Sequence, residues 1–109
     1  MLREFATRVR KSIRGIDLAC RYGGEEFVVV MPETDMAVAA VVAERIRRRI
    51  ACESFPIQKG SGAIDVTISI GIAGLAAAAD SAETILKRAD QALYRAKRDG
   101  RNRVVADAA

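Results

Sequence analysis

The stretch LACRYGGEEFVVVM, residues 18–31, decides the fold, because two glycines and two carboxylates separate two strand-like runs. Residues 18–22 read as a short strand, and residues 27–31 form the continuous apolar run that is typical of a buried central strand. A glycine pair between two such runs predicts a tight hairpin, since the turn needs a positive φ that glycine adopts without strain.

The tip of this hairpin also suggests chemistry. Without side chains at Gly23 and Gly24, a nucleotide's sugar and phosphates could lie directly against backbone, and Glu25 and Glu26 offer the hard oxygen ligands that Mg²⁺ prefers. The alternative is a hairpin tip that is polar merely because tips are solvated. These residues by themselves favour neither interpretation.

Length and composition predict one domain. The chain has 109 residues, and none of its apolar runs approaches the ~20 residues that span a bilayer. Its first residues open an amphipathic helix instead of a secretory signal, so we expect a cytoplasmic protein without a membrane segment. The net charge of +4 suits an anionic ligand such as a nucleotide, yet it fits many ordinary domains as well.

Cysteine and histidine usage excludes several kinds of site. Cys20 and Cys52 match no zinc or redox spacing, and we expect both to be reduced and structural. The chain has no histidine, which removes the commonest catalytic base and metal ligand.

Helices and strands are predicted to alternate in the order αββαβαβ, without repeats. A first helix runs to about residue 14 and ends with Gly15 as its C-terminal cap. Residues 32–35 supply the N-cap of a second helix, and residues 52–63 read as a loop or a small excursion. Residues 65–73 alternate as the strongest strand signal. Asp80 or Ser81 caps the last helix, before a short strand at residues 104–105. Two helix faces are expected to be buried: Val38, Val42, Ile46 and Ile50, and then Leu86, Ala89, Leu93 and Ala96. This order fits an α+β sandwich with a mainly antiparallel sheet.

Several motifs in one order make the chain resemble the GGDEF family of diguanylate cyclases, in its GGEEF variant. RGID at residues 14–17 ends five residues before Gly23, where the family carries an RxxD inhibitory site. KRAD at 87–90, YRAK at 94–97 and GRNRV at 100–104 are similar to the family's closing helix and last strand. Several matches in register are more specific than any one of them.

The resemblance implies an architecture and a reaction. The family has a ferredoxin-like core related to the palm of nucleotide cyclases. Two such domains, each holding one GTP, face each other as a homodimer and make cyclic di-GMP, each 3′-hydroxyl attacking the other nucleotide's α-phosphate. This nucleotidyl transfer depends on Mg²⁺ or Mn²⁺ and on charge neutralisation, so the absence of histidine is no obstacle.

The resemblance also assigns roles to residues at the matching positions. Glu25 and Glu26 become the catalytic and metal-binding carboxylates, and Gly23 and Gly24 form the close backbone approach to GTP. Lys97 and Arg101 match the pair of cations that holds the β- and γ-phosphates. The alternative for these two is that cations near a helix C-terminus complement the helix dipole wherever they occur.

Arg14, Asp17 and Arg45 match the inhibitory cyclic di-GMP site. Chemistry supports the first two, because arginine binds guanine O6 and N7 and a carboxylate can accept from guanine N1–H and N2–H₂. The alternatives are a solvated ion pair at a helix end and, for Arg45, a solvated helix face.

One departure from the family limits the expected activity. In the family a first strand and a first helix precede the position of Leu2 and carry another metal-binding aspartate and the residues that read the guanine. We therefore expect residues 1–109 to be a partial GGDEF domain with little activity alone, whose parent protein has a sensor or receiver domain. The open sheet would favour a homodimer or a strand-exchanged oligomer.

Two other functions stay open. The chain could be a cyclic di-GMP sensor module without catalysis. A ferredoxin-like module that binds RNA is disfavoured, because the chain has few aromatic residues and no aromatic pair on one strand, so we expect no nucleic-acid partner.

Overall fold

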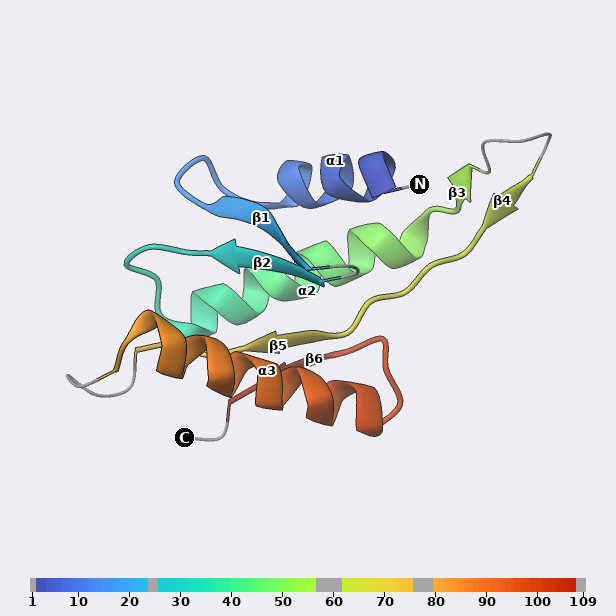
Figure 1. The fold of residues 1–109 in the computed structure, drawn as a ribbon. Helices are drawn as coiled ribbons and strands as arrows, with labels where there is room; N and C mark the ends of the chain where they lie inside the picture. Colours follow the sequence, from blue (N-terminus) through green and yellow to red (C-terminus); the bar gives the residue numbers. More distant parts are fainter. Residues whose placement is uncertain (1, 24–25, 57–61, 76–79, 108–109) are drawn as a thin grey trace.

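The computed structural model describes residues 2–23, 26–56, 62–75 and 80–107. Three helices and short strand pairs follow one another as the sequence predicts, with one added pair between the second helix and the strand after it (Figure 1). The elements are α1 (Leu2–Ser12), β1 (Leu18–Gly23), β2 (Glu26–Val30), α2 (Met36–Cys52), β3 (Phe55–Pro56), β4 (Ala63–Ile64), β5 (Ile70–Ile72), α3 (Ala82–Arg98) and β6 (Val104–Ala106). The predicted α+β class is confirmed.

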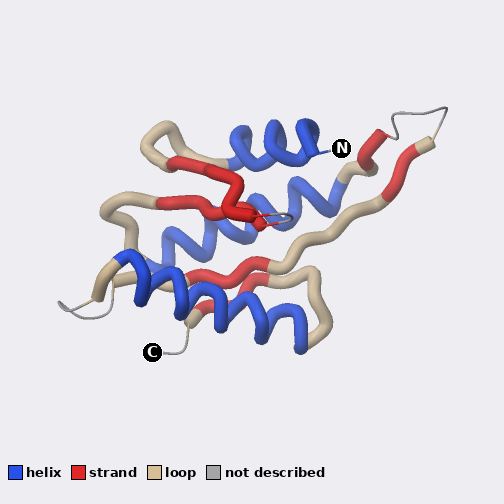
Figure 2. Tube along the Cα trace, in the orientation of Figure 1, coloured by secondary structure: helices blue, strands red, loops and turns tan. Residues whose placement is uncertain are grey.

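The described strands form three separate pairs (Figure 2). β1 pairs with β2 and β3 with β4, both antiparallel, whereas β5 and β6 are parallel because α3 connects them as a crossover. The predicted hairpin between residues 18–22 and 27–31 is confirmed, with each strand extended by one residue towards the turn.

The first helix ends earlier than its sequence pattern predicts. α1 stops at Ser12, and Gly15 does not adopt the left-handed conformation of a C-terminal cap. Gly15 instead lies inside a turn closed by the Asp17 N–H, which donates to the Arg14 carbonyl at 3.0 Å. The prediction of Gly15 as a cap was wrong because the side chain of Asp17 stabilises this turn.

Two helix N-termini are capped as predicted. The Asp35 side chain accepts from the Val38 N–H at 2.9 Å, and Ser81 forms a capping box with Thr84. Such caps satisfy backbone donors that have no partner within the helix.

The main core lies between α1, α2 and one face of the strands. Its buried members are Val9, Val42, Ile46, Ile50 and Phe55. The β1–β2 hairpin contributes Ala19 and Val29 to this core, and the rings of Phe5 and Phe27 lie 4.9 Å apart between α1 and β2. These contacts position the hairpin on α1.

The buried face of α2 differs by one position from the prediction. Val38 is 40% exposed, and Ala39 and Ala43 are buried in its place, in a second cluster with Ile72. The shift arises because the first turns of α2 pack against β5 and β6, which need small residues opposite them.

α2 and α3 lie on opposite sides of β5 (Figure 1). Ile70 and Ile72 point to the α2 side, so Gly71 faces α3. A Cβ atom at residue 71 would lie 2.3 Å from the Ala89 carbonyl oxygen and 2.3 Å from the Leu93 nitrogen. Only glycine allows β5 and α3 to approach this closely.

The predicted strand over residues 65–73 is shorter in the structure. Only residues 70–72 pair as a strand, although Val66 and Ile68 still pack on the main core while Thr67 is exposed. The alternation therefore predicted the orientation of the side chains correctly. It failed for the backbone, because residues 65–69 have no neighbouring strand within the described chain.

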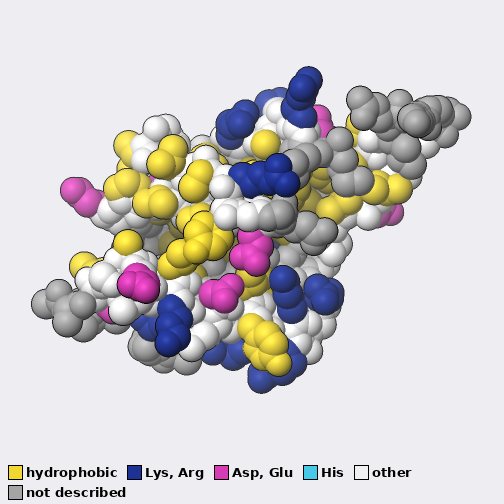
Figure 3. Space-filling model, in the orientation of Figure 1, with side chains coloured by type: hydrophobic (Ala, Val, Ile, Leu, Met, Phe, Trp, Pro, Cys, Tyr) yellow, Lys and Arg dark blue, Asp and Glu magenta, His cyan; other side chains and the backbone are white. Residues whose placement is uncertain are grey.

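The face of the hairpin that points away from α1 is uncovered. Its exposed apolar side chains include Leu18, Tyr22 and Val30, which are 62%, 61% and 49% exposed. Figure 3 shows hydrophobic side chains gathered over this part of the molecule. β2 is thus half-buried and does not form the buried central strand that its sequence predicts.

Candidate functional site

The end of the β1–β2 hairpin is the first part of the site. Gly23 pairs with Glu26 across the hairpin, after a shift of register between Arg21 and Gly23. Glu26 is exposed, and a Cβ atom placed on Gly23 would meet nothing within 4 Å, so backbone at this point is open to a ligand. Gly24 and Glu25, the other predicted residues of this loop, lie outside the described residues.

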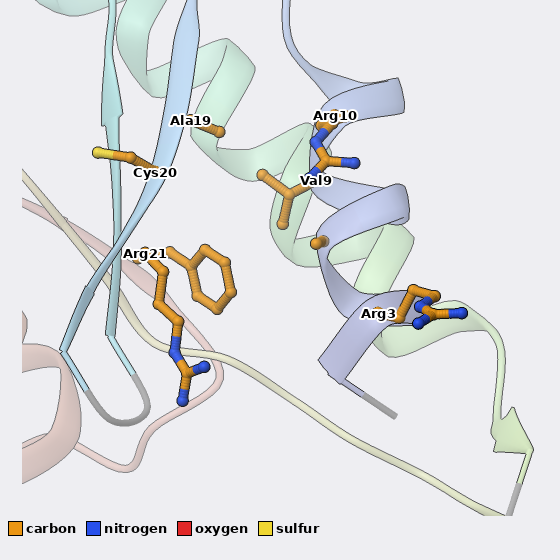
Figure 4. A pocket seen from close by; sticks show the side chains of 8 residues that line it. Arg3, Val9, Arg10, Ala19, Cys20 and Arg21 are labelled. Carbon is orange, nitrogen blue, oxygen red and sulfur yellow. The ribbon is translucent and has the colours of Figure 1, made fainter. Parts of the chain in front are cut away.

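A concavity of about 440 Å³ opens between α1 and the β1–β2 hairpin. It is lined by Arg3, Ala6, Val9, Arg10, Ala19, Cys20, Arg21 and Phe27. Figure 4 shows that Arg3 and Arg10 point away from β1, whereas Arg21 extends on the strand side. Since these cations do not converge on one point, the apolar wall dominates, and the concavity is not a preformed anion site.

Arg14 and Asp17 form a tight pair. The Arg14 side chain donates to both carboxylate oxygens of Asp17, from Nε at 3.0 Å and from Nη2 at 2.8 Å. The backbone N–H of Arg14 donates to the same carboxylate at 2.9 Å. The Asp17 side chain is fully buried, while 31% of the Arg14 side chain is exposed. Asp17 therefore orients Arg14, and Arg14 is the member that a ligand can reach.

Thr34 is a third member of this cluster that the sequence did not reveal. Arg14 Nη2 donates to the Thr34 hydroxyl at 2.6 Å, and that hydroxyl donates to the Pro32 carbonyl at 2.8 Å. Thr34 lies just before α2, so the bond joins the end of α1 to the start of α2. A lone threonine next to an N-cap residue carries no signal of such a contact.

Charges around Asp17 lower the pKa of its carboxyl. Hydrogen bonds from the Arg14 side chain are the main cause, burial opposes them, and the charge of Arg45 adds to the lowering. Arg45 is exposed on α2, yet its charge acts on Asp17. The structure thus bonds two of the predicted inhibitory-site residues, Arg14 and Asp17, directly to each other, and Arg45 acts on Asp17 through its charge alone.

Lys97 and Arg101 lie at the C-terminal end of α3, and both are exposed. The helix ends at Arg98, and Gly100, Arg101 and Asn102 all have positive φ, at 124°, 62° and 47°. The Arg101 N–H donates to the Ala96 carbonyl at 2.9 Å, which closes the end of the helix. Arg101 thus projects from a tightly wound loop.

Of the two predicted metal ligands, Glu25 and Glu26, only Glu26 lies within the described residues. The part of the chain that the structure describes holds no group of three or more His, Cys, Asp or Glu side chains that could bind a metal ion. An exposed carboxylate beside an open backbone fits one edge of a Mg²⁺ site by the chemistry of its oxygen donors.

Cys20 and Cys52 are both free, as predicted, but both are exposed. The structural role that the sequence predicted for them was therefore wrong. No helix within the described residues is long and apolar enough to cross a membrane.

The fold and the hairpin define a small α+β domain with an exposed glutamate, Glu26, at the end of the described part of the hairpin. The sequence matches the family described as "Diguanylate cyclase, GGDEF domain" over residues 1–103. The chain therefore belongs to the GGDEF family, as its motifs predicted.

Similar proteins carry related names. The chain is 51% identical over 109 residues to the response regulator PleD of Caulobacter vibrioides, covering 100% of this chain and 24% of that protein. It is 44% identical over 104 residues to diguanylate cyclase A of Treponema denticola, covering 95% of this chain and 28% of that protein. The chain thus spans about a quarter of the length of these curated relatives.

Solved structures agree with the family. The GGDEF domain of DgcB from Caulobacter crescentus, in complex with c-di-GMP, superposes with a TM-score of 0.87 at 31% identity, over 98% of this chain and 63% of that one. An active GGEEF domain of a diguanylate cyclase from Vibrio cholerae gives a TM-score of 0.83 at 32% identity, over 99% of this chain and 67% of that one.

Proposed function

We propose that this chain is the GGEEF part of a diguanylate cyclase domain that condenses two GTP molecules into cyclic di-GMP. The observation that carries the proposal is the hairpin, which sets Gly23 opposite the exposed Glu26 at an open backbone. In the reaction, each 3′-hydroxyl bonds to the α-phosphorus of the other GTP and pyrophosphate leaves. Such a transfer needs positioning and charge neutralisation more than a protein nucleophile.

The residues of the chain divide this work. Gly23 and Gly24 let the nucleotide approach the backbone, and Lys97 and Arg101 hold the β- and γ-phosphates. Glu25 and Glu26 would hold Mg²⁺ or Mn²⁺, and a divalent cation bound there would neutralise charge on the reacting phosphates. The open space at Gly23 and the exposure of Glu26, Lys97 and Arg101 support these roles.

Cyclic di-GMP inhibits through Arg14, Asp17 and Arg45 in this proposal. Arg14 reads the guanine edge, Asp17 fixes the guanidinium, and Arg45 adds positive charge from α2. The support is the pair of bonds from Arg14 to Asp17 at 3.0 and 2.8 Å and the effect of Arg45 on Asp17.

A second candidate function is a cyclic di-GMP sensor without catalysis. The observation in its favour is the Arg14–Asp17 pair, in which a buried carboxylate holds a guanidinium that is partly exposed and can be reached by a guanine. The two candidate functions differ in one measurable property: a cyclase converts GTP to cyclic di-GMP, and a sensor only binds cyclic di-GMP.

The test is an assay of cyclic di-GMP from GTP and Mg²⁺. We expect no product above background from the 109-residue chain and clear product from a version extended by a family-type first strand and helix. Glu25→Ala should abolish that product, and Glu83→Ala, an exposed carboxylate in the first turn of α3, should not. An extended version without turnover that still binds cyclic di-GMP would favour the sensor.

A further inference from the structure

Arg47 of α2 joins that helix to the loop that follows α3. Glu44 accepts two hydrogen bonds from Arg47, from Nε at 2.8 Å and from Nη2 at 2.7 Å. The third nitrogen of the guanidinium, Nη1, donates to Asn102 Oδ1 at 2.8 Å. The Arg47 side chain is 20% exposed, so it is held between a helical carboxylate and the loop, largely shielded from water.

The loop that Arg47 contacts has an unfavourable backbone. Arg101 and Asn102 both have left-handed φ angles, of 62° and 47°, which L-residues adopt at a cost that neighbouring contacts must offset. Within the loop, Arg103 Nε donates to the Arg101 carbonyl at 3.0 Å. The Arg47 bond adds an anchor from a different element, at the residue next to Arg101.

We infer that Arg47 is a positioning residue for Arg101, acting through Asn102. This inference rests on the proposed phosphate role of Arg101. A cation that projects from a fixed backbone loses less conformational freedom when it binds a phosphate, so holding the loop raises affinity without any contact between Arg47 and the nucleotide.

The chain offers a matched control. Arg48 donates to the same carboxylate, Glu44, at 2.8 Å, but its side chain is 74% exposed on the surface of α2. Arg48→Ala therefore removes one arginine from Glu44 and leaves the loop contact in place. Asn102→Gly tests the other end, because glycine keeps the left-handed backbone while the side-chain amide is lost.

The first measurement is hydrogen exchange at the Arg101 N–H, whose bond to Ala96 closes the loop. We expect exchange to be roughly 3- to 10-fold faster in Arg47→Ala, which corresponds to the free energy of one lost hydrogen bond. We expect it to be unchanged in Arg48→Ala. Equal exchange in the wild type and Arg47→Ala would overturn the inference, whether or not GTP binds.

The second measurement is the affinity for GTP with Mg²⁺, by calorimetry, of the version extended by a family-type first strand and helix. Arg47→Ala and Asn102→Gly should each weaken binding by roughly 3- to 10-fold. The double variant should weaken it no further, since both single changes remove the same hydrogen bond between Arg47 and Asn102. If Arg101→Ala weakens binding and Arg47→Ala does not, the positioning role is refuted and the phosphate role stands. If the wild type and Arg101→Ala bind GTP equally, the phosphate role of Arg101 is refuted. The hydrogen-exchange rates then still test, independently, whether Arg47 holds the loop.

Discussion

The guanidinium carbon of Arg8 lies 3.8 Å from the centre of the Phe55 ring. Both residues are buried, and Arg8 also donates to the carbonyls of Glu53 and Ser54 at 2.7 and 2.9 Å and to the Glu4 carboxylate at 2.8 Å. One side chain on α1 thus fixes the segment that leaves α2 and covers the aromatic ring in the main core. The buried charge of Arg8 is tolerated because its guanidinium donates three hydrogen bonds and lies against the face of an aromatic ring.

Arg8→Ala should be among the most destabilising single changes in α1. It removes the hydrogen bonds to the Glu53 and Ser54 carbonyls and uncovers Phe55, so we expect a loss of about 1–3 kcal/mol in the free energy of unfolding. Urea denaturation measures it. The control is Arg10→Ala on the exposed side of the same helix, which should change stability by no more than about 0.5 kcal/mol. Equal midpoints for the two variants would contradict this account of Arg8.

Gly71→Ala should destabilise the contact between β5 and α3. The added methyl would lie 2.3 Å from backbone atoms of Ala89 and Leu93, which cannot rotate away. We expect a loss of about 1–3 kcal/mol in thermal or urea unfolding. Gly15→Ala is the matched change, since nothing lies within 4 Å of its Cβ position. It should leave stability unchanged or slightly higher. A neutral Gly71→Ala would show that α3 shifts easily on β5.

Acid should weaken the contribution of Glu44. Hydrogen bonds from Arg47 and Arg48 lower its pKa from 4.5 to about 2. A lowered folded-state pKa gives stability that is present above pH 4.5 and is lost as the pH falls towards 2. The carboxylate is partly exposed, so the effect is below about 1 kcal/mol and shrinks with salt.

The measurement is urea unfolding of the wild type and Glu44→Gln across that pH range. The wild type should be more stable at neutral pH, and the difference should vanish near pH 2. A difference that does not change with pH would mean that Glu44 stabilises by packing instead of by charge.

Arg14→Ala should remove most of the affinity for cyclic di-GMP. Loss of the arginine–guanine contact should cost about 1–3 kcal/mol. Asp17→Ala should weaken binding as well, because Arg14 loses the carboxylate that orients it. Titration calorimetry compares these variants with Arg49→Ala, an exposed arginine of α2. Binding that is equal in all four proteins would refute the inhibitory site.

The unpaired edges of β2 and β5 should recruit a strand. The two strands are in different pairs, and no described strand lies between them, so each presents backbone donors and acceptors along one edge. We expect concentration-dependent association of the chain, by strand exchange or edge pairing, in sedimentation. Hydrogen exchange should show weak protection over residues 65–69 in dilute solution. A dilute monomer with both strands fully protected would refute this prediction.

Local signals in the sequence predicted most of the elements, because turns and caps depend on few residues. The glycine pair predicted the hairpin, and Asp35 and Ser81 predicted two helix starts, since each signal acts within a few residues of itself. The Gly15 cap failed because of its near neighbour Asp17, but two other signals that failed depend on distant partners. Val38 was predicted to be buried, but β5 and β6 select Ala39 instead. Residues 65–69 alternate as a strand does and still have no strand beside them.

The candidate site divides in the same way. The motifs identified Arg14 and Asp17 as neighbours, because a short turn brings them together. They could not identify Thr34, Arg47 or Asn102, whose contacts join residues 20 and 55 positions apart in the chain. Such contacts follow from how α2 packs against the rest of the fold, which no short stretch of sequence encodes.

Gly71 also bears on how conservation in this family should be interpreted. In a family of nucleotide cyclases, a retained glycine invites the conclusion that it makes room for the ligand, and the open space at Gly23 agrees with that. At residue 71 the space is already filled by α3, and any larger residue would strike helix backbone. A glycine retained there among relatives would therefore record the tight packing of a helix against a strand, not a catalytic requirement.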